Sequence, residues 1–421
     1  MNFKASAISL LAFATTVATI LALGRHKTPD VWEYDTIAVN MLQGNGYLIG
    51  WLNTDYRSLG YPLYPVFCAA ILYLTRHSYV AIELAQAVMV ALTCYLVYMI
   101  ATKVFDERSA LFASFLTALH PGLIVYATRI HELTCVVFFI TLLAMLMCVC
   151  DREKISSAAL VGFITGLGIL LRPTLLLFLP AYGLYIYLAS RSARKGVVAC
   201  LVASAVAGLV ILPWTVRNYN VHKRFIFITT SSAEHFWRGN NQHSTGTALT
   251  PDNRGMIEVA PKEFTAKLFA LDEMGQYDLF YKETRGFIAS HPTFFAKLVA
   301  KKIFYFWWFS PQTGLWYPPL WTSVYKVYYA AVLLFFVGGS YHALSRLRGE
   351  KRSYIIALFA FFALVSICHG LYYVEIRHRW AIEPLMLMLA SYGLVCLLPA
   401  PKRLASVEFA DSVSQRLRRL G

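Results

Sequence analysis

Hydrophobic residues run through this chain in long segments, and short polar stretches separate most of them. A helix needs about 20 consecutive apolar residues to cross a bilayer, and runs near that length recur along the chain. The pattern predicts an all-α polytopic membrane protein with about ten transmembrane helices. The spans are expected at residues 7–24, 79–101, 109–126, 132–150, 156–171, 174–190, 196–213, 323–345, 353–371 and 379–398.

The composition agrees with this class of protein. Of the 421 residues, 58% are hydrophobic and only 14% are charged, and the mean hydropathy is +0.53. Soluble domains carry about 25% charged residues. The net charge of +15 does not indicate nucleic-acid binding, because most Lys and Arg residues lie in short clusters beside apolar runs. Clusters of this kind orient membrane proteins.

The eight cysteines all lie in apolar segments, where cysteine behaves as a small hydrophobic residue, so no disulfide is expected. No spacing of Cys and His resembles a zinc site. The first apolar run follows a single lysine, Lys4, and is longer than a typical signal-peptide core, which predicts an uncleaved anchor. Residues 1–421 are interpreted as one integral membrane domain.

The distribution of Lys and Arg predicts which ends of the spans face the cytoplasm. If the apolar stretch 63–75 does not cross the membrane, one side holds 17 Lys and Arg in 53 residues, and the opposite short loops hold 7 in 68. Basic loops stay on the cytoplasmic side. We therefore expect an inner-membrane protein with both termini in the cytoplasm and 63–75 lying along the outer surface as an interfacial helix.

Two long outer segments follow from this topology, at 25–78 and 214–322. The second is expected to contain amphipathic helices at 261–274 and 276–289. It closes with an aromatic and basic run at 301–309, which is typical of the membrane interface. The tail 399–421 is basic and is expected on the anionic inner leaflet.

Three carboxylates lie within six residues directly after the first apolar run: Asp30, Glu33 and Asp35. Acidic groups at the mouth of an apolar bundle are costly to desolvate, so they are candidates for catalysis. Each also has a structural explanation. Asp30 would cap a helix over 32–42, Glu33 would meet that helix's dipole, and Asp35 would lie on its solvated face.

A fourth candidate acid, Glu132, begins a span just after Arg129 and His131. One interpretation is an interfacial cap or an ion pair with Arg129. The other is an acidic group that faces the first outer loop across a cavity. His131 is interpreted as a hydrogen-bonding interfacial residue rather than a metal ligand.

Five arginines are predicted at outer ends of spans or in outer loops, against the usual charge bias. The planar guanidinium binds two phosphate oxygens and stays charged, which suits it to a phosphate-linked substrate. The alternative is that these side chains snorkel to lipid headgroups, or, for Arg172 before Pro173, cap helix carbonyls. The residues are Arg57, Arg172, Arg217, Arg377 and Arg379, of which Arg377 and Arg379 are favoured.

A third set of residues could contact a sugar or an acceptor. Asn240 and Asn241 follow Gly239 and are also explained as a turn. Tyr34 and Tyr61 could stack on a sugar, but packing of the loop is the favoured explanation. His235 could bind an acceptor or simply be solvated.

Several short motifs along the chain together resemble GT-C membrane glycosyltransferases, in particular the bacterial branch related to protein O-mannosyltransferases and the lipid A aminoarabinose transferase. The resemblance covers nearly the whole chain. The motifs are Asp30-x-x-x-Tyr34-x-x-Ile37-Ala38, Gln43-Gly44-x-Gly46-Tyr47, Arg57-x-x-Gly60-Tyr61-Pro62, Arg129-x-x-Glu132, Leu171-Arg172-Pro173, Pro213-Trp214-Thr215-x-Arg217-Asn218-Tyr219, Gly239-Asn240-Asn241 and Glu375-x-Arg377-x-Arg379-x-x-Ile382-x-Pro384.

The resemblance implies a GT-C-like bundle with interfacial helices and transfer of a sugar from a polyprenyl-phosphate donor to a glycan, lipid or protein acceptor on the outer side, usually with inversion. A loop carboxylate would be the general base, and arginines would hold the carrier phosphate. Relatives often carry an acidic residue directly after the first loop Asp, whereas Val31 follows Asp30 here. Whether Asp30 acts alone, with Glu33 or with Asp35 stays open.

The resemblance also implies that no cofactor is required. Paired loop acids could still hold Mg²⁺ or Mn²⁺ through few protein ligands and several waters. Two other functions fit a polytopic protein: a transporter or flippase for a lipid-linked solute, and a ligase or polymerase of lipid-linked glycans. The transporter class expects ionisable groups near the bilayer midplane and often inverted repeats, and neither is evident in the sequence.

Overall fold

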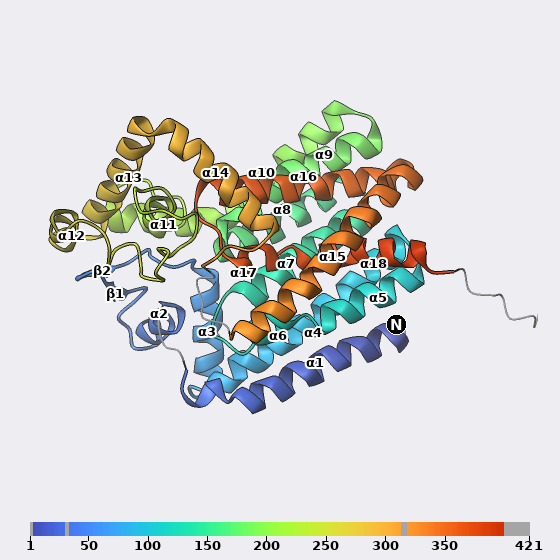
Figure 1. Cartoon of the computed structure of the whole chain (residues 1–421), viewed down its shortest axis with the longest axis horizontal. Coiled ribbons are helices and arrows are strands. Elements are labelled where there is room, and N and C mark those ends of the chain that lie inside the picture. Colours follow the sequence, from blue (N-terminus) through green and yellow to red (C-terminus); the bar gives the residue numbers. More distant parts are fainter. Residues whose placement is uncertain (1–2, 30–32, 313–317, 400–421) are drawn as a thin grey trace, which may run out of the picture.

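The computed structural model shows an elongated helical bundle with a second, mostly helical lobe at one end (Figure 1). The structure describes residues 3–29, 33–312 and 318–399. Asp30 and the tail from residue 400 therefore lie outside the described residues. Within those ranges the only sheet is one two-stranded hairpin, so the prediction of an all-α polytopic fold is confirmed.

The bundle helices follow most of the predicted spans. Within the described chain, six helical stretches are long and apolar enough to cross a membrane. They are α1 (Phe3–Leu23), α4 (Tyr79–Val104), η2 (Pro173–Leu177) continued by α9 (Phe178–Ser190), α10 (Ala193–His222), α15 (Pro319–Arg346) and α16 (Gly349–Leu371). Three other predicted spans form shorter apolar helices: α7 (Leu133–Val149), α8 (Ile155–Leu171) and α18 (Glu383–Leu397).

The predicted span 109–126 is instead two helices, α5 (Glu107–Ala118) and α6 (Pro121–Tyr126). Pro121 has no N–H to continue the helix and disfavours a helical conformation at His120. The backbone of His120 is extended (ψ 112°), and its Nδ1 accepts a hydrogen bond from Leu123 N (3.2 Å). The expectation of one continuous helix was therefore wrong.

The first outer segment forms a short helix, a hairpin and a second helix. The 3-10 turn η1 (Arg25–Lys27) follows α1, and α2 (Glu33–Leu42) lies within the predicted helix 32–42. The hairpin of β1 (Ile49–Trp51) and β2 (Thr54–Tyr56) comes next. Helix α3 (Leu63–Leu74) matches the predicted interfacial stretch 63–75, and it runs across the direction of the neighbouring bundle helices (Figure 1).

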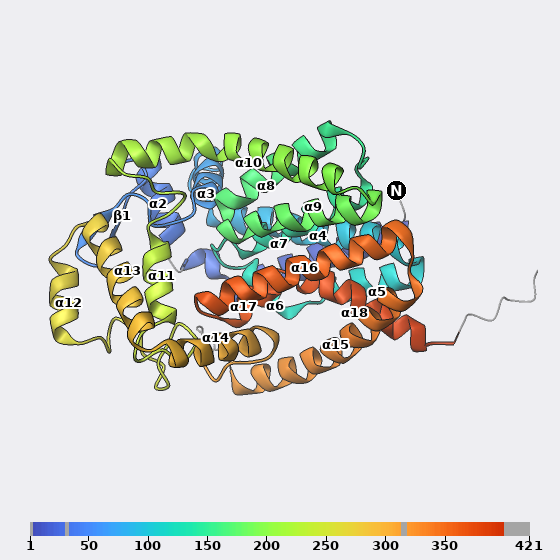
Figure 2. The same ribbon diagram turned by 90° about the horizontal axis from the view of Figure 1, so that it is seen from above.

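The long segment after α10 contains α11 (Ser231–Gly239), α12 (Lys262–Phe269), α13 (Glu273–Ser290) and α14 (Pro292–Trp307). The expected helix 261–274 was too long. Helix α12 ends at Phe269 because Asp272 caps α13, accepting a hydrogen bond from Gly275 N (2.8 Å). Together, residues 33–62 and 223–291 make up the loop lobe, which lies beside the end of the bundle in both views, whereas α3 and α14 pack against bundle helices (Figures 1 and 2).

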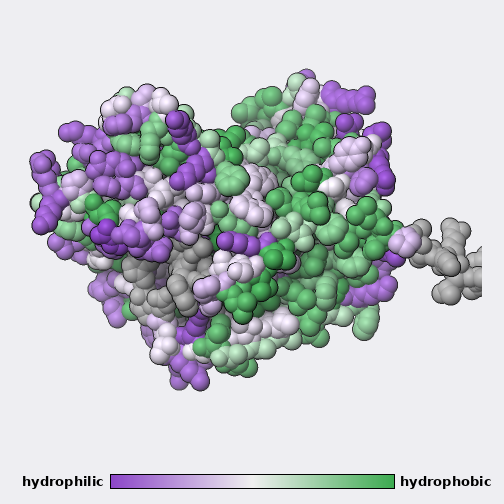
Figure 3. All heavy atoms as spheres, viewed as in Figure 1, coloured by the Kyte–Doolittle hydropathy of each residue, from purple (hydrophilic) through white to green (hydrophobic). Residues whose placement is uncertain are grey.

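The hydropathy of the surface differs between the bundle and the loop lobe. Hydrophobic residues cover most of the visible face of the bundle, and hydrophilic residues cover the loop lobe and reappear at the far end of the bundle (Figure 3). The N-terminus and the end of α18 both lie at that far end, opposite the lobe (Figure 1). This arrangement places the two predicted long outer segments at the same end of the bundle.

Small residues allow the bundle helices to approach closely. A Cβ added at Gly162 of α8 would lie 2.3 Å from the carbonyl oxygen of Ala203 on α10. A Cβ at Gly339 of α15 would lie 1.9 Å from the carbonyl oxygen of Leu389 on α18. Contacts between small residues are the usual means of helix association in membranes, where no hydrophobic driving force exists.

A buried ionic cluster fastens the last helices together. Glu383 at the start of α18 contacts Nε2 of His120, accepts a hydrogen bond from Arg379 Nε (2.7 Å) and accepts another from the hydroxyl of Tyr325 (3.0 Å). All four residues are buried. Buried charges persist when they are paired and hydrogen-bonded, and this cluster satisfies that condition.

Candidate functional site

A cavity of about 750 Å³ lies where the loop lobe meets the bundle. Its wall comes from the start of α2, the turn before α7, the turn before η2, α11, the loop 248–258, and the segment from the end of α16 through α17 (Ile376–Trp380). The fold thus gathers segments that are far apart in the sequence. The charged side chains in the wall are Glu33, Asp35, Arg129, Glu132, Arg172, Glu234, Arg238, Glu258, Glu375 and Arg377.

Glu33 is an acid whose pKa is strongly shifted by its surroundings. Burial, and next the negative charge of Glu132, raise the pKa of Glu33 to about 8 despite nearby Arg377. Its carboxylate packs against Gly60, where an added Cβ would lie 3.0 Å from Glu33 Oε1. A carboxyl group with a pKa near neutrality can exchange a proton with a bound substrate.

Glu132 has the opposite character. Burial alone would raise its pKa, but His131, Arg172 and Arg377 hold the pKa of this carboxyl below its usual value. His131 Nδ1 lies 3.0 Å from Glu132 Oε2, and Arg172 Nη1 lies 3.7 Å from Glu132 Oε1. Glu132 therefore stays ionised while Glu33 carries a proton at neutral pH. Two carboxyls with separated pKa values are characteristic of acid–base sites.

Two arginines of the cavity are held by carboxylates of their own segments. Arg377 Nε lies 2.7 Å from Glu375 Oε2. Arg238 Nη2 lies 2.6 Å from Glu234 Oε1, and its guanidinium lies over the ring of Tyr373 at 5.5 Å. Both guanidinium groups are therefore fixed in orientation within the wall of the cavity.

Arg172 differs from these two, because Nη1 is buried and has no hydrogen-bond acceptor among the described residues. The whole residue is only 9% exposed. A buried donor without an acceptor costs free energy, which an incoming anion would remove. The sequence-based assignment of Arg172 to a helix cap does not explain this position.

Aromatic and imidazole rings line much of the remaining wall. Tyr34 lies edge-on to His131, with 6.1 Å between the ring centres, and His369 stacks on His378 at 4.2 Å. His235 lies edge-on to Tyr373 at 5.5 Å. Tyr61 also lines the cavity. Flat apolar faces next to polar groups suit a sugar ring, which presents C–H groups on one face and hydroxyls at its edge.

The cavity thus includes eight of the residues proposed from the sequence, namely Glu33, Asp35, Glu132, Arg172, Arg377, Tyr34, Tyr61 and His235. Asp30 lies outside the described residues. The other five, Arg57, Arg217, Arg379, Asn240 and Asn241, are not among the residues that line it.

The three arginines of this second set lie outside the cavity wall: two of them bind other groups of the protein, and the third is exposed. Arg379 is fully buried, pairs with Glu383 and donates to the carbonyl oxygen of Trp308 (2.7 Å). Arg217 donates to the carbonyl oxygen of Arg57 (2.6 Å) and so ties α10 to the first loop. The side chain of Arg57 is exposed.

The two asparagines are structural. Asn240 Nδ2 donates to the carbonyl oxygens of Phe236 and Leu371 (2.8 Å each), and Asn240 Oδ1 accepts from the buried Lys302 (2.7 Å). Asn241 Nδ2 donates to the carbonyl oxygen of Trp237 (3.0 Å). Both therefore close the end of α11, as the turn interpretation held.

Sequence reasoning missed several residues of the wall. Glu234 and Arg238 are spaced four apart on α11 and form an i,i+4 ion pair, a signal that the sequence contains. Glu375 lies in one of the sequence motifs, but it was not predicted to be a site residue. His369 and His378 carried no signal, because their stacking depends on how α16 meets α17. Among the described residues, no three His, Cys, Asp or Glu side chains are grouped so that they could hold a metal ion.

Comparison with known proteins agrees with this architecture. Residues 60–216 match the family model of dolichyl-phosphate-mannose-protein mannosyltransferases. No curated protein sequence matches the chain. The resemblance to GT-C membrane glycosyltransferases that the sequence indicates is therefore confirmed.

Solved structures with a similar fold include two from an archaeon. The apo oligosaccharyltransferase of Archaeoglobus fulgidus superimposes with a TM-score of 0.55 at 14% identity, covering 93% of this chain and 50% of that protein. Oligosaccharyltransferase AglB of the same organism, in complex with an inhibitory peptide and a dolichol-phosphate, gives 0.54 at 11% identity, covering 99% of this chain and 54% of that one. The chain spans about half the length of these proteins, and the likeness concerns the fold.

Proposed function

We propose that this protein transfers a sugar from a polyprenyl-phosphate donor to an acceptor hydroxyl in the cavity between the bundle and the loop lobe, on the outer side of the membrane. The observation that carries the proposal is the placement of one buried arginine, two half-buried arginines and two unlike carboxyls in one cavity at the end of an apolar bundle. A lipid-linked phosphate needs cations beside hydrocarbon, and sugar transfer needs a base.

In this proposal the arginines hold the carrier phosphate. Arg172 is the first contact, because its Nη1 is buried without an acceptor among the described residues. Arg377 and Arg238 add positive charge nearby. Donors aimed at the oxygen on which charge develops lower the barrier most in a site shielded from water. Here that oxygen is the one joining the phosphate to the sugar.

Glu33 is the proposed general base. The acceptor oxygen attacks the anomeric carbon, its proton passes to the Glu33 carboxylate, and the bond from the anomeric carbon to the phosphate oxygen breaks with its electron pair staying on the phosphate. Direct displacement inverts the anomeric centre. Glu132 remains ionised and stabilises the positive charge that develops on the sugar ring. Asp30, three residues before Glu33, stays a sequence-based prediction for the same role.

The direct test is transfer by the purified full chain in lipid nanodiscs, with polyprenyl-phosphate sugars as donors. Mass spectrometry of carrier lipids and surface glycans from cells with and without the gene would name the donor and the acceptor. Accumulation of a single-sugar carrier in the deletion strain supports the proposal. Movement of an unchanged lipid-linked sugar across the bilayer, without any glycosidic bond formed, would replace it with a transport function.

A further inference from the structure

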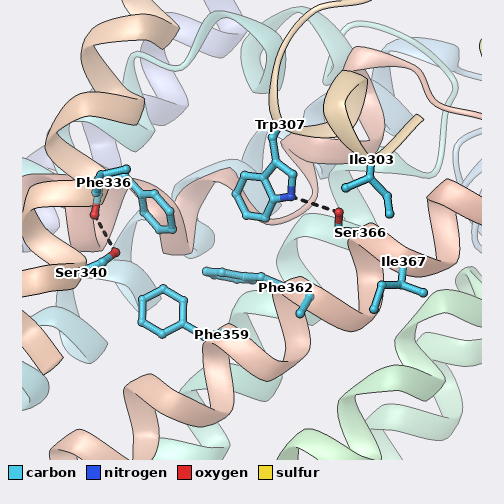
Figure 4. Close-up of a pocket in the computed structure, with 10 residues that line it drawn as sticks. Ile303, Trp307, Phe336, Ser340, Phe359, Phe362, Ser366 and Ile367 are labelled. Carbon is cyan, nitrogen blue, oxygen red and sulfur yellow. Dashed lines mark hydrogen bonds between the residues drawn. The ribbon is translucent and has the colours of Figure 1, made fainter. Parts of the chain in front are cut away.

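An apolar groove of about 420 Å³ lies outside the cavity, between α14, α15 and α16 (Figure 4). The rings of Trp307, Phe336, Phe359 and Phe362 form much of its wall, and Ile303 and Ile367 lie at one end. The side chains of Val337 and Ile367 at its edge are 59% and 50% exposed. The groove is therefore open on the hydrocarbon-facing side of the bundle.

The packing of α15 explains why this space exists. At Gly339, α15 approaches α18 so closely that a Cβ would meet the carbonyl oxygen of Leu389. Toward α16, three of the positions that line the groove are small: Ser340 of α15, and Ala363 and Ser366 of α16. Helix α15 thus packs tightly against α18, and small side chains leave a gap toward α16.

The polar atoms in the groove are already satisfied. Trp307 Nε1 donates to Ser366 Oγ (3.0 Å), and Ser340 Oγ donates to the carbonyl oxygen of Phe336 (2.6 Å). Both hydrogen bonds are drawn in Figure 4. The groove therefore offers mainly apolar contact, which suits a hydrocarbon chain better than a sugar.

A positively charged residue, Lys326, lies on the same face of α15 as the groove, nearer the start of the helix. Lys326 is exposed and begins a stripe spaced by four and three residues, which continues through Ala330, Leu333, Val337 and Ser340. At 1.5 Å per residue, Lys326 lies about 15 Å along the helix from Phe336. Among the described residues Lys326 has no acidic partner, and its one contact of note is the ring of Phe309 at 5.6 Å.

The groove adjoins the cavity along α16. On α16, Ser366 and Ile367 line the groove, and the next two residues, Cys368 and His369, line the cavity. The same Phe309 ring lies 5.2 Å from the guanidinium of Arg379, which is two residues after Arg377 in the cavity wall. A lipid in the groove would therefore contact the same part of α16 that contributes to the cavity wall.

We propose that this face is a second binding site for the polyprenyl-phosphate carrier, with its isoprenoid chain in the groove of α14, α15 and α16 and its phosphate on Lys326. The inference rests on the proposed function, because it takes the carrier as the occupant. A lysine on the lipid-facing side of a span calls for an anionic partner, and a chain extending from that partner along the stripe reaches the groove. The site holds the carrier beside the cavity before or after transfer.

The test uses the full chain in nanodiscs of phosphatidylcholine with a diazirine-tagged polyprenyl phosphate and maps the cross-linked residues. The expected labels fall on α15 and α16 around Phe359 and Ala363. One lysine near an anionic lipid contributes about 1 kcal/mol, so Lys326→Gln should reduce this labelling about fivefold. Ala363→Leu fills the groove and should do the same, whereas Ala331→Leu, the same change at an exposed position of α15, should not.

A kinetic readout separates this site from the reaction itself. Lys326→Gln and Ala363→Leu should raise the KM for the donor and leave kcat unchanged. The inference is overturned, with the proposed function left intact, if neither substitution reduces groove labelling. The same conclusion follows if phosphatidylglycerol reduces groove labelling as well as unlabelled polyprenyl phosphate does. The proposed function is overturned instead if the protein shows no transfer while groove labelling persists, and if Arg172→Ala leaves the labelling of the cavity unchanged.

Discussion

The pKa of Glu33 leads to a prediction for the pH dependence of transfer. Burial raises this pKa to about 8, so the base form of Glu33 is scarce at neutral pH. With that value, about 10% of Glu33 is ionised at pH 7 and about 90% at pH 9. Because a general base must be ionised, kcat/KM should rise about ninefold across this range and level off above it.

The substitution Glu33→Gln keeps the size of the side chain and removes the base. We expect transfer to fall by about 10²–10⁴-fold and the rise with pH to disappear. The assay is the initial rate with a saturating acceptor in nanodiscs, measured from pH 6.5 to 9.5. Glu283→Gln, the same change at an exposed position of α13, is the matched control and should leave both the rate and the profile unchanged.

Stability distinguishes loss of chemistry from loss of folding. A carboxyl with a raised pKa in the folded state contributes stability at low pH, and that contribution is lost as the pH rises toward 8. Glu33→Gln should therefore raise the Tm at pH 8 while it lowers the rate. A flat rate profile in the unchanged protein, or near-normal turnover by the variant, would refute the assignment of Glu33. Asp30→Asn and Asp35→Asn measured beside it would then identify the base.

Four further outcomes are expected. Arg172→Ala should weaken binding of polyprenyl phosphate by about 10–100-fold, since a charged hydrogen bond contributes roughly 1.5–3 kcal/mol; an unchanged Kd would remove Arg172 from the phosphate site. Gly60→Ala should lower kcat in a folded protein, because its Cβ would press on Glu33 Oε1 at 3.0 Å. Glu383→Gln should lower stability by about 3–5 kcal/mol in detergent unfolding, by leaving Arg379 buried without its carboxylate. Treatment with EDTA should leave transfer intact because arginines neutralise the phosphate; activity lost and restored by Mg²⁺ or Mn²⁺ would contradict this.

Much of the fold could be predicted because hydrophobic runs act locally. The run that became α4 is continuous and needs no knowledge of its neighbours. The dipeptide His120-Pro121 contains a local signal for the break between α5 and α6. The apolar residues on both sides nevertheless favoured the prediction of one continuous span. The hairpin of β1 and β2 was missed because strands of three residues leave hardly any periodicity.

The site was predicted in part for a different reason. Glu33, Glu132 and Arg377 stood out as charges beside apolar runs, and the fold does bring them to one cavity. Arg379 carried the same signal, yet its side chain turns inward to Glu383, and only the packing of α18 determines that direction. The pairing of Arg238 with Glu234 could be read from their spacing, whereas its position in the wall depends on how α11 lies against the bundle.

The ion pairs of Arg377 with Glu375 and of Arg238 with Glu234 have a consequence for turnover. In the proposed reaction, an arriving carrier phosphate displaces a paired carboxylate at Arg377 and at Arg238, whereas at Arg172 it meets an Nη1 that has no acceptor among the described residues. The spent carrier can be displaced by the same carboxylates as they return. Slow product release, the usual penalty of a strongly basic pocket, is thereby reduced.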